Sequence, residues 1–433
     1  MHRRAALAVA AAGLLALGAC SAGDLGSSDD GTTVSFLVDN EPSTVKNSEA
    51  LAKAFNAKNP GIKVKVETRP QGGEGDNIVK TRLATGDMAN VFAYNSGSLF
   101  QALKPEQNLV ALDDQAYQST IDQVFKTTVT SGGKVYGAPY GAAVGGGILY
   151  NKAVYSRLGL QVPKTWAEFM ANNAKLKAAG VAPVVQTYQD TWTSQVIVLG
   201  DFHNVAAAQP DFADKFTKNQ AKFATTPAAL RSFQRLQEIH DAGYQNSDFA
   251  SLKLEQGLKM LAEGGGAHFP ILTFALATLA ANNPDQVKDV GFFALPGDDA
   301  DKFGLTVWEP GAFYIPKSTT GAKLDAAKKF VAFAVSKEGC DTIIKTTTPG
   351  GPFVIKGCTL PDNVPPAVKD MQPYFDSGAN SPALEFLSPV KGPALEQITV
   401  EVGSGIRKAA DGAALYDQDV KKQAQQLGLP GWS

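Results

Sequence analysis

The sequence has 433 residues, of which 44% are hydrophobic and 19% are charged, and its formal net charge is −2. This length exceeds what one hydrophobic core usually organises, so we expect two lobes. The balanced charge, a pI near 6.1 and the lack of a basic run with interleaved aromatic residues argue against a nucleic-acid partner.

Residues 1–19 have the layout of a secretory signal peptide. A short basic start precedes an Ala-rich apolar run over residues 5–17, which is shorter than the roughly 20 residues that a membrane-spanning helix needs. Residues 17–20, Leu-Gly-Ala-Cys, resemble a bacterial lipobox, so we expect cleavage followed by lipidation of Cys20. The alternative is an ordinary signal peptide with an incidental cysteine. Residues 20–31 are small and polar, which predicts a flexible tether.

The mature chain begins with a strand, a helix and a second strand. Alternating residues predict a strand over 33–38, which is followed by the polar turn 39–43. Helical spacing over 48–59 ends at Pro60, and a second alternating run covers 62–67. Three further elements continue the order: a helix over 77–86, a strand over 91–94 and a helix over 97–104. This alternation predicts an α/β fold with open, mostly parallel sheets.

Several motifs follow one another along the mature chain. They are Asn59-Pro60-Gly61-Ile62, Leu83-Ala84-Thr85-Gly86-Asp87, Val135-Tyr136-Gly137-Ala138-Pro139-Tyr140, Tyr150-Asn151-Lys152, Pro163-Lys164-Thr165-Trp166-Ala167-Glu168-Phe169 and Ala312-Phe313-Tyr314-Ile315-Pro316-Lys317-Ser318. In this order and spacing they resemble the extracellular solute-binding proteins of family 1. This maltose-binding-protein-like family serves ABC importers of carbohydrates.

The resemblance implies a periplasmic-binding-protein-like fold in which two lobes close like a Venus flytrap. By analogy, lobe one takes 32–140 plus 291–318, and lobe two takes 141–290 plus 319–433. Two or more strands should cross between the lobes at hinges. The glycines at 145–147 either give the hinge its flexible backbone or allow close packing of a sheet, and both readings stay open.

Two cysteines remain if Cys20 carries lipid. Cys340 and Cys358 form a pair in a secreted setting, so we expect a structural disulfide, with two free thiols as the alternative. The four histidines are scattered, and the sequence contains neither a CxxC nor an HExxH motif. We therefore expect no metal centre and no cofactor.

Aromatic and polar residues cluster at the inferred strand ends. A sugar offers apolar C–H faces and a rim of hydroxyl groups, so a good site combines aromatic rings with carboxylates and amides. In an open α/β sheet such groups belong at the carboxyl ends of the strands. The candidate ligand-binding residues are Asp39, Asn40, Glu41, Tyr94, Asn95, Tyr140, Tyr188, Asp190, Trp192, His268, Phe269, Trp308 and Glu309.

Four aromatic residues differ in the role that we expect of them. Trp166 stands at a helix start with a Thr165 cap, so we expect it in the core, and we expect the same of Phe386. His268 and Phe269 occupy a stretch where the relatives commonly carry a tryptophan. The chain departs from the family pattern there, and either residue could replace the stacking contact.

The sequence thus predicts a lipid-anchored, monomeric receptor on the outer face of the bacterial cytoplasmic membrane. The resemblance implies a di- or oligosaccharide ligand and an ABC permease as partner. A binding protein for a peptide or a polyamine is one alternative, because carboxylates around aromatic rings also suit amines. A secreted glycoside hydrolase is another, with Asp190 and Glu309 as its carboxyl pair. Neither a GxSxG nor an HExxH motif is present to support an enzyme.

Overall fold

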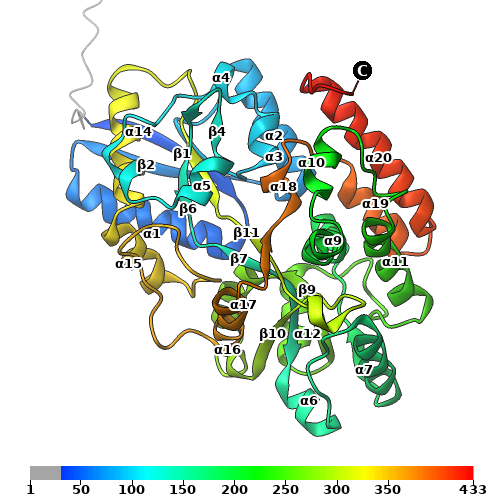
Figure 1. Cartoon of the computed structure of the whole chain (residues 1–433). Coiled ribbons are helices and arrows are strands. Elements are labelled where there is room, and N and C mark those ends of the chain that lie inside the picture. Colours follow the sequence, from blue (N-terminus) through cyan, green and yellow to red (C-terminus); the bar gives the residue numbers. More distant parts are fainter. Residues whose placement is uncertain (1–30, 433) are drawn as a thin grey trace, which may run out of the picture.

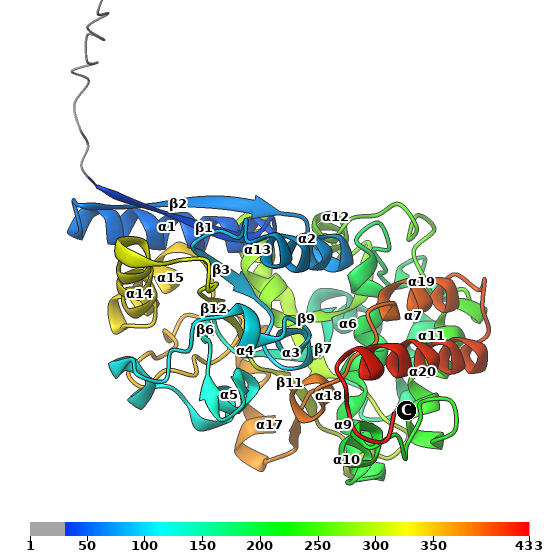
Figure 2. The same ribbon diagram turned by 90° about the horizontal axis from the view of Figure 1, so that it is seen from above.

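The computed structural model describes residues 31–432, so the predicted signal peptide, Cys20 and nearly all of the tether lie outside the described residues. Two open β-sheets form the centres of two lobes, which lie side by side in Figures 1 and 2. The predicted α/β class and two-lobed organisation are confirmed. Over residues 31–432, no helix combines the length and the apolar character needed to cross a membrane.

The first sheet contains the strands that the sequence predicts near the start of the mature chain. Its order is β2-β1-β3-β12-β6. Strands β1 and β2 pair in parallel along their whole length, and β3 pairs in parallel with β1. β12 is antiparallel to both of its neighbours. The bounds are β1 (Thr32–Asp39), β2 (Ile62–Arg69), β3 (Val91–Tyr94), β6 (Ala138–Tyr140) and β12 (Gly311–Tyr314), and β4 (Thr130–Ser131) pairs with β5 (Lys134–Val135) beside the sheet.

Helices cover the first sheet. α1 begins at Pro42 rather than at Ser48 as predicted, because the Glu41 side chain accepts a hydrogen bond from the backbone of Thr44 (2.8 Å) and a proline starts the first turn. The bounds are α1 (Pro42–Lys58), α2 (Gly72–Thr85), α3 (Ser98–Ala102), α4 (Pro105–Asn108), α5 (Gln123–Thr128), α14 (Gly321–Ala334) and α15 (Lys337–Thr346).

α14 and α15 belong to the first lobe, although residues 319–433 were expected in the second. Figure 1 shows α14, drawn in yellow, beside the blue strands of the first sheet. The ring of Phe330 on α14 lies 5.3 Å from that of Phe36 on β1 and 5.4 Å from that of Phe55 on α1. These three buried rings are part of one core, which a prediction from local sequence cannot detect.

The second sheet corrects the other expected boundary. β10 and β11 pair with β7 in this sheet, so residues 291–308 belong to the second lobe. The chain returns to the first lobe at Gly311 and not at Gly291. The pairs around β7 are antiparallel, and the sheets are therefore mixed rather than mostly parallel. The order is β13-β11-β7-β9-β8 with β10 also on β7, and the bounds are β7 (Val144–Asn151), β8 (Ala182–Val184), β9 (Gly266–Leu272), β10 (Val290–Ala294), β11 (Leu305–Trp308) and β13 (Asn380–Pro382).

The helices of the second lobe surround this sheet. α7 has the predicted capping box, in which the side chains of Thr165 and Glu168 each accept a hydrogen bond from the backbone N–H of the other residue. Trp166 is buried, as predicted. The bounds are α6 (Lys152–Leu158), α7 (Trp166–Ala178), α8 (Val196–Gly200), α9 (Phe202–Ala208), α10 (Phe212–Thr217), α11 (Pro227–Asp241), α12 (Leu254–Ala262), α13 (Leu276–Asn282), α16 (Pro366–Lys369), α17 (Gln372–Ser377), α18 (Leu384–Leu387), α19 (Leu395–Gly403) and α20 (Ala409–Gln426).

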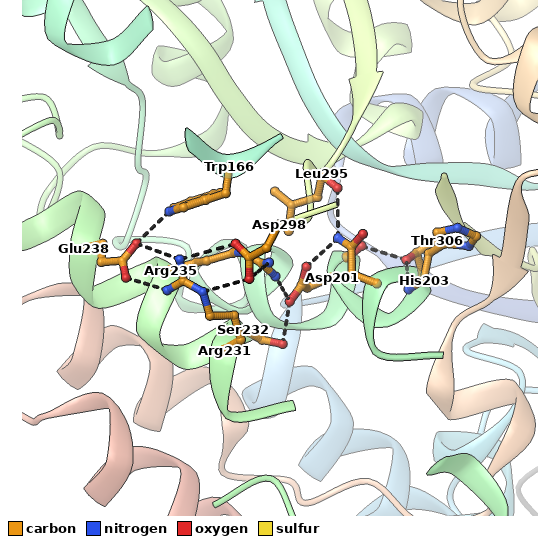
Figure 3. Close-up of polar contacts among 12 residues, drawn as sticks. Trp166, Asp201, His203, Arg231, Ser232, Arg235, Glu238, Leu295, Asp298 and Thr306 are labelled. Carbon is orange, nitrogen blue, oxygen red and sulfur yellow. Dashed lines mark hydrogen bonds and ion pairs between the residues drawn. The ribbon is translucent and has the colours of Figure 1, made fainter. Parts of the chain in front are cut away.

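A polar network ties α9 and α11 to the loop after β10 (Figure 3). Arg235 pairs with the buried carboxylate of Asp201 and, at 3.2 Å, with Asp298. Ser232 also donates to Asp201 (2.8 Å), and Arg231 reaches Asp298 (3.1 Å). A buried carboxylate is tolerated only when it is paired and hydrogen-bonded, so this network fixes three segments of lobe two relative to one another.

The chain crosses between the lobes three times within the described residues. The crossings are residues 141–143, residues 309–310 and the stretch after Cys358. The glycines at 145–147 lie inside the regular strand β7, next to the first crossing. A Cβ on Gly146 would come within 2.1 Å of the Trp308 ring, so this glycine serves close packing.

The predicted disulfide between Cys340 and Cys358 is confirmed. It joins α15 to the end of a loop that returns toward the boundary between the lobes. Within this loop, Gly350 accepts a hydrogen bond from Thr273 (2.7 Å) and Pro352 accepts one from the backbone of Ala143 (2.8 Å). The bridge therefore holds a segment that contacts both a hinge crossing and the second lobe.

Candidate functional site

A cavity of about 370 Å³ lies between the two lobes. The first lobe contributes the carboxyl ends of β1 and β3 and the N-terminus of α2. The second lobe contributes the short 3-10 helix Thr191–Gln195, the end of β11 and the segment around α18 and α19. Its volume is near the lower end of the range, about 300 to 1,000 Å³, that is typical of small-molecule sites.

Eight of the predicted binding residues line this cavity. The rule that polar groups gather at the carboxyl ends of strands is the reason that most of them meet, because β1, β3 and β11 all end there. The eight residues are Asp39, Glu41, Tyr94, Asn95, Tyr140, Trp192, Trp308 and Glu309.

His268 and Phe269 do not line the cavity, which corrects the prediction that one of them replaces a stacking contact. Both are fully buried on β9. The His268 ring nitrogens lie 2.6 Å from the Tyr155 hydroxyl and 2.8 Å from the Asn173 amide oxygen. Burial lowers the pKa of His268 to about 3, so this imidazole is a neutral core group. The aromatic residue that does reach the cavity from this segment is Phe274.

Asn40, Tyr188 and Asp190 also lie outside the cavity lining. Asn40 is exposed, and Tyr188 is buried in the second lobe. The Asp190 carboxylate accepts a hydrogen bond from the backbone of Leu254 (2.7 Å), at the start of α12. Asp190 therefore has a capping role and does not face Glu309, so the carboxyl pair considered for glycoside hydrolysis is not assembled.

Several lining residues were not predicted from the sequence, and Phe386, which was expected in the core, lines the cavity. Most of the missed residues come from helices and loops that carry no strand-end signal. Arg69 is an exception, since it ends β2 and could have been found by extending the predicted strand to its last residue. The missed lining residues with polar or aromatic side chains include Arg69, Asp76, Phe274, Phe353, Glu385, Phe386, Lys391 and Glu396.

Aromatic rings form one wall of the cavity. The rings of Trp192 and Phe274 lie 5.7 Å apart with a tilt of 31°. Trp308 packs with Phe274 and Phe386 in a small cluster, and its indole nitrogen donates a hydrogen bond to Glu385. This wall offers flat apolar faces, on which the C–H face of a ring-shaped ligand can stack.

In the part of the chain that the structure describes, five buried polar atoms of lining residues have no hydrogen-bond partner. They come from both lobes and include donors as well as carboxylate oxygens. Buried polar atoms are normally hydrogen-bonded, so a group of them around one cavity indicates a polar ligand. The atoms are Nε of Arg69, Oη of Tyr94, Nε1 of Trp192, Oε2 of Glu309 and Oε2 of Glu385.

Burial shifts the titration of several lining groups. It raises the pKa of Glu309 to about 7, and the nearby charge of Asp122 adds to the shift. Burial also raises the pKa of Asp39, although the charge of Arg69 opposes this. Burial and the charge of Asp76 raise the pKa of Tyr94, so the phenol stays neutral and can donate a hydrogen bond.

Two polar contacts join the lobes beside the cavity. Thr278 on α13 donates a hydrogen bond to the Glu41 carboxylate, and Gly73 on α2 donates its backbone N–H to Glu396 on α19 (3.1 Å). Figure 2 shows α2 and α13 close to the boundary between the lobes. The structure is therefore a closed arrangement in which both lobes contact each other around the cavity. Over residues 31–432, no cluster of His, Cys, Asp and Glu could hold a metal ion.

Comparison with known proteins identifies the family. Residues 40–339 match the family described as bacterial extracellular solute-binding protein. The chain belongs to this family. An extracellular family implies that this solute-binding protein works outside the cytoplasm.

Relatives and solved structures agree with this assignment. The chain is 26% identical over 323 residues to the multiple sugar-binding protein of Streptococcus mutans, covering 73% of both chains. It is 26% identical over 354 residues to the diacetylchitobiose binding protein DasA of Streptomyces coelicolor, covering 78% of this chain and 79% of the relative. A chitin oligosaccharide binding protein has the same fold, with a TM-score of 0.79 at 22% identity over 92% of this chain and all of the other.

Proposed function

We propose that this solute-binding protein is the substrate-binding component of an ABC importer and captures a carbohydrate, a di- or oligosaccharide, between its lobes. The observation that carries the proposal is the meeting of aromatic faces and unpartnered buried polar atoms from both lobes around one cavity. The sugar names of the relatives support the same ligand class. A sugar satisfies both kinds of group at once, because its hydroxyls donate and accept while its C–H faces stack.

The proposed mechanism is a shift between open and closed forms. Sugar binding favours the closed form only if the ligand contacts both lobes, because a ligand shifts an equilibrium by its differential affinity for the two states. Tyr94 from the first lobe and Trp192 from the second line the same cavity, which supports such a bridge. The closed form would then be the one that the membrane permease recognises.

A thermal-shift screen of the purified protein against mono-, di- and oligosaccharides tests the ligand class. A ligand that binds only the native state at 100 times its dissociation constant adds about 2.7 kcal/mol to the unfolding free energy. We expect a rise in Tm with one sugar series and none with peptides or polyamines. A rise in Tm with a polyamine or peptide alone would leave the proposal of a binding protein intact but would reject a sugar as its ligand. Release of new reducing ends from a bound oligosaccharide would show that the protein is a hydrolase.

We further propose that the protein is a monomer anchored through lipid on Cys20. The small, polar residues after Cys20 support a tether between the anchor and the folded lobes. Intact-mass measurement on the membrane-extracted protein should give the mass of a lipidated chain that starts at Cys20. We expect Cys20→Ala to appear in the soluble fraction, and an unlipidated wild-type mass would reject the anchor.

A further inference from the structure

Acidic side chains outnumber basic ones around the cavity. Six carboxylates line it, three from the first lobe and three from the second or from the hinge crossing. They are Asp39, Glu41, Asp76, Glu309, Glu385 and Glu396. Glu41 is fully used by Thr278, Ser43 and the backbone of Thr44, but its charge still contributes to the field inside the cleft.

Among residues 31–432, the only basic side chains that line the cavity are Arg69 and Lys391, and both have an acidic neighbour. The Arg69 guanidinium lies 5.5 Å from the centre of the Tyr94 ring, donates to the backbone of Pro70 (3.0 Å) and has the Asp39 charge nearby. Its remaining N–H groups, including the unpartnered Nε, can still donate hydrogen bonds to a ligand, but the nearby Asp39 carboxylate offsets the charge of the guanidinium.

Lys391 is held by a carboxylate of its own lobe. Its Nζ lies 3.8 Å from Oε2 of Glu385, and both side chains are nearly buried. The remaining oxygen of Glu385 is occupied by the Trp308 indole. The positive charge of Lys391 is therefore already balanced inside the protein, and it is not free for an anionic ligand.

The cavity is also lined by acceptor oxygens and by carboxylates that face each other from the two lobes. Within residues 31–432, Oε2 of Glu309 has no hydrogen-bond partner, and Oε2 of Glu385 has only the Lys391 ammonium, 3.8 Å away. Asp76 on α2 and Glu396 on α19 face the cleft from opposite lobes, and burial together with the charge of Asp76 raises the pKa of Glu396. A ligand that brings hydrogen-bond donors or a positive charge relieves this repulsion, whereas a negative charge adds to it.

We infer, on the basis of the proposed function, that the cleft selects by charge: it binds sugars with an ammonium group best, neutral sugars next, and sugars with a carboxylate or phosphate least. Tyr94 supports a ligand-binding site here, because its side chain is 3% exposed and its hydroxyl has no hydrogen-bond partner among residues 31–432. The selection is of the kind that proteins achieve by placing like charges against the wrong ligand.

Matched ligand series test the inference. Each series holds one neutral sugar, its amino form and its uronic acid or 6-phosphate, for example cellobiose with the chitosan disaccharide and cellobiuronic acid, and titration calorimetry at about pH 6.5 keeps the amines protonated. We expect the anionic member to bind at least about tenfold more weakly than the neutral one, and the amino member more tightly. Equal or tighter binding of the anionic member would overturn the inference and leave the proposed function intact. Silence with every member of every series would overturn both.

Neutralising variants give a second readout. In Asp76→Asn combined with Glu396→Gln, the side-chain shapes are kept, one acceptor oxygen remains at each position and two charges are removed. We expect the ratio between the affinities for the neutral and anionic members to fall by several-fold. Glu255→Gln is the matched control, because Glu255 is an exposed carboxylate on α12 that does not line the cavity. An unchanged ratio in the double variant would show that these carboxylates do not discriminate.

Discussion

Oε1 of Glu396 on α19 lies 3.1 Å from the backbone nitrogen of Gly73 on α2, and this hydrogen bond joins the two lobes across the mouth of the cavity. Burial raises the pKa of Glu396, while the Gly73 N–H opposes the shift because it favours the ionised carboxylate. The contact can exist only when the lobes are close together. It therefore stabilises the closed form without stabilising either lobe alone.

Removal of this contact should weaken ligand binding more than it weakens folding. We expect Glu396→Ala to lose about 1 kcal/mol of sugar affinity. Without this hydrogen bond the closed form is less stable relative to the open form, so part of the binding free energy is spent on closing the lobes. Small-angle scattering of the ligand-free variant should show a larger radius of gyration. Glu396→Gln keeps an acceptor oxygen at this position and serves as the control. An unchanged affinity and radius in the alanine variant would show that the contact does not affect closure.

The two tryptophans of the aromatic wall should respond differently to truncation. We expect Trp192→Ala to weaken sugar binding by roughly 1 to 3 kcal/mol with little loss of stability, because this side chain is only partly buried and its Nε1 has no partner. Trp308→Ala should lower both affinity and Tm, since its ring packs against Gly146 and its indole bonds Glu385.

Titration calorimetry and thermal denaturation separate these effects. Trp166→Phe is the control, because Trp166 lies in the core of the second lobe and does not line the cavity. It should change Tm without changing affinity. If neither cleft variant altered the affinity for a sugar that the wild-type protein binds, the ligand would lie elsewhere.

The elements that the sequence predicts well are those with strong local signals. The alternating residues of β1 and β2 and the capping box of α7 depend on neighbours in the chain, and all three elements form where expected. The boundary between the lobes depends on contacts across long stretches of chain. Phe330 reaches Phe36 through a core that brings together segments about 300 residues apart, so no local pattern could assign α14 to the first lobe.

The candidate site shows the same division. Asp39, Tyr94 and Trp308 were found because each stands at the carboxyl end of a strand, where ligand-binding groups of α/β lobes gather. The prediction that His268 lines the site was wrong. Its hydrogen-bond partners, Tyr155 and Asn173, lie about 100 residues away in the sequence and hold the imidazole inside the core. The charged residues of helices and loops were missed because only the folded chain brings them to the cavity.

Loss of the disulfide should destabilise the first lobe. In the chain-entropy model, a bridge between residues 18 positions apart contributes about 3 kcal/mol to the unfolding free energy. We expect Cys340→Ser combined with Cys358→Ser to lose a large part of this stability, and the reductant dithiothreitol to lower the wild-type Tm toward that of the variant. The Tm of the variant should not respond to reductant. A wild-type Tm that stayed unchanged after verified reduction would contradict a stabilising role.

Glu309 should make the stability of the ligand-free protein depend on pH. Burial raises its pKa from 4.5 to about 7, so between these values the native state holds a proton that the unfolded state has lost. The unfolding free energy therefore decreases as the pH rises through this range, and the cost is complete above pH 7. Glu309→Gln is neutral throughout and should exceed the wild type by roughly 1 to 3 kcal/mol at pH 8 but hardly at all at pH 4.5. Urea unfolding at both values measures the difference, with Glu255→Gln as an exposed control. A difference that does not change with pH would mean that Glu309 titrates normally in the folded protein.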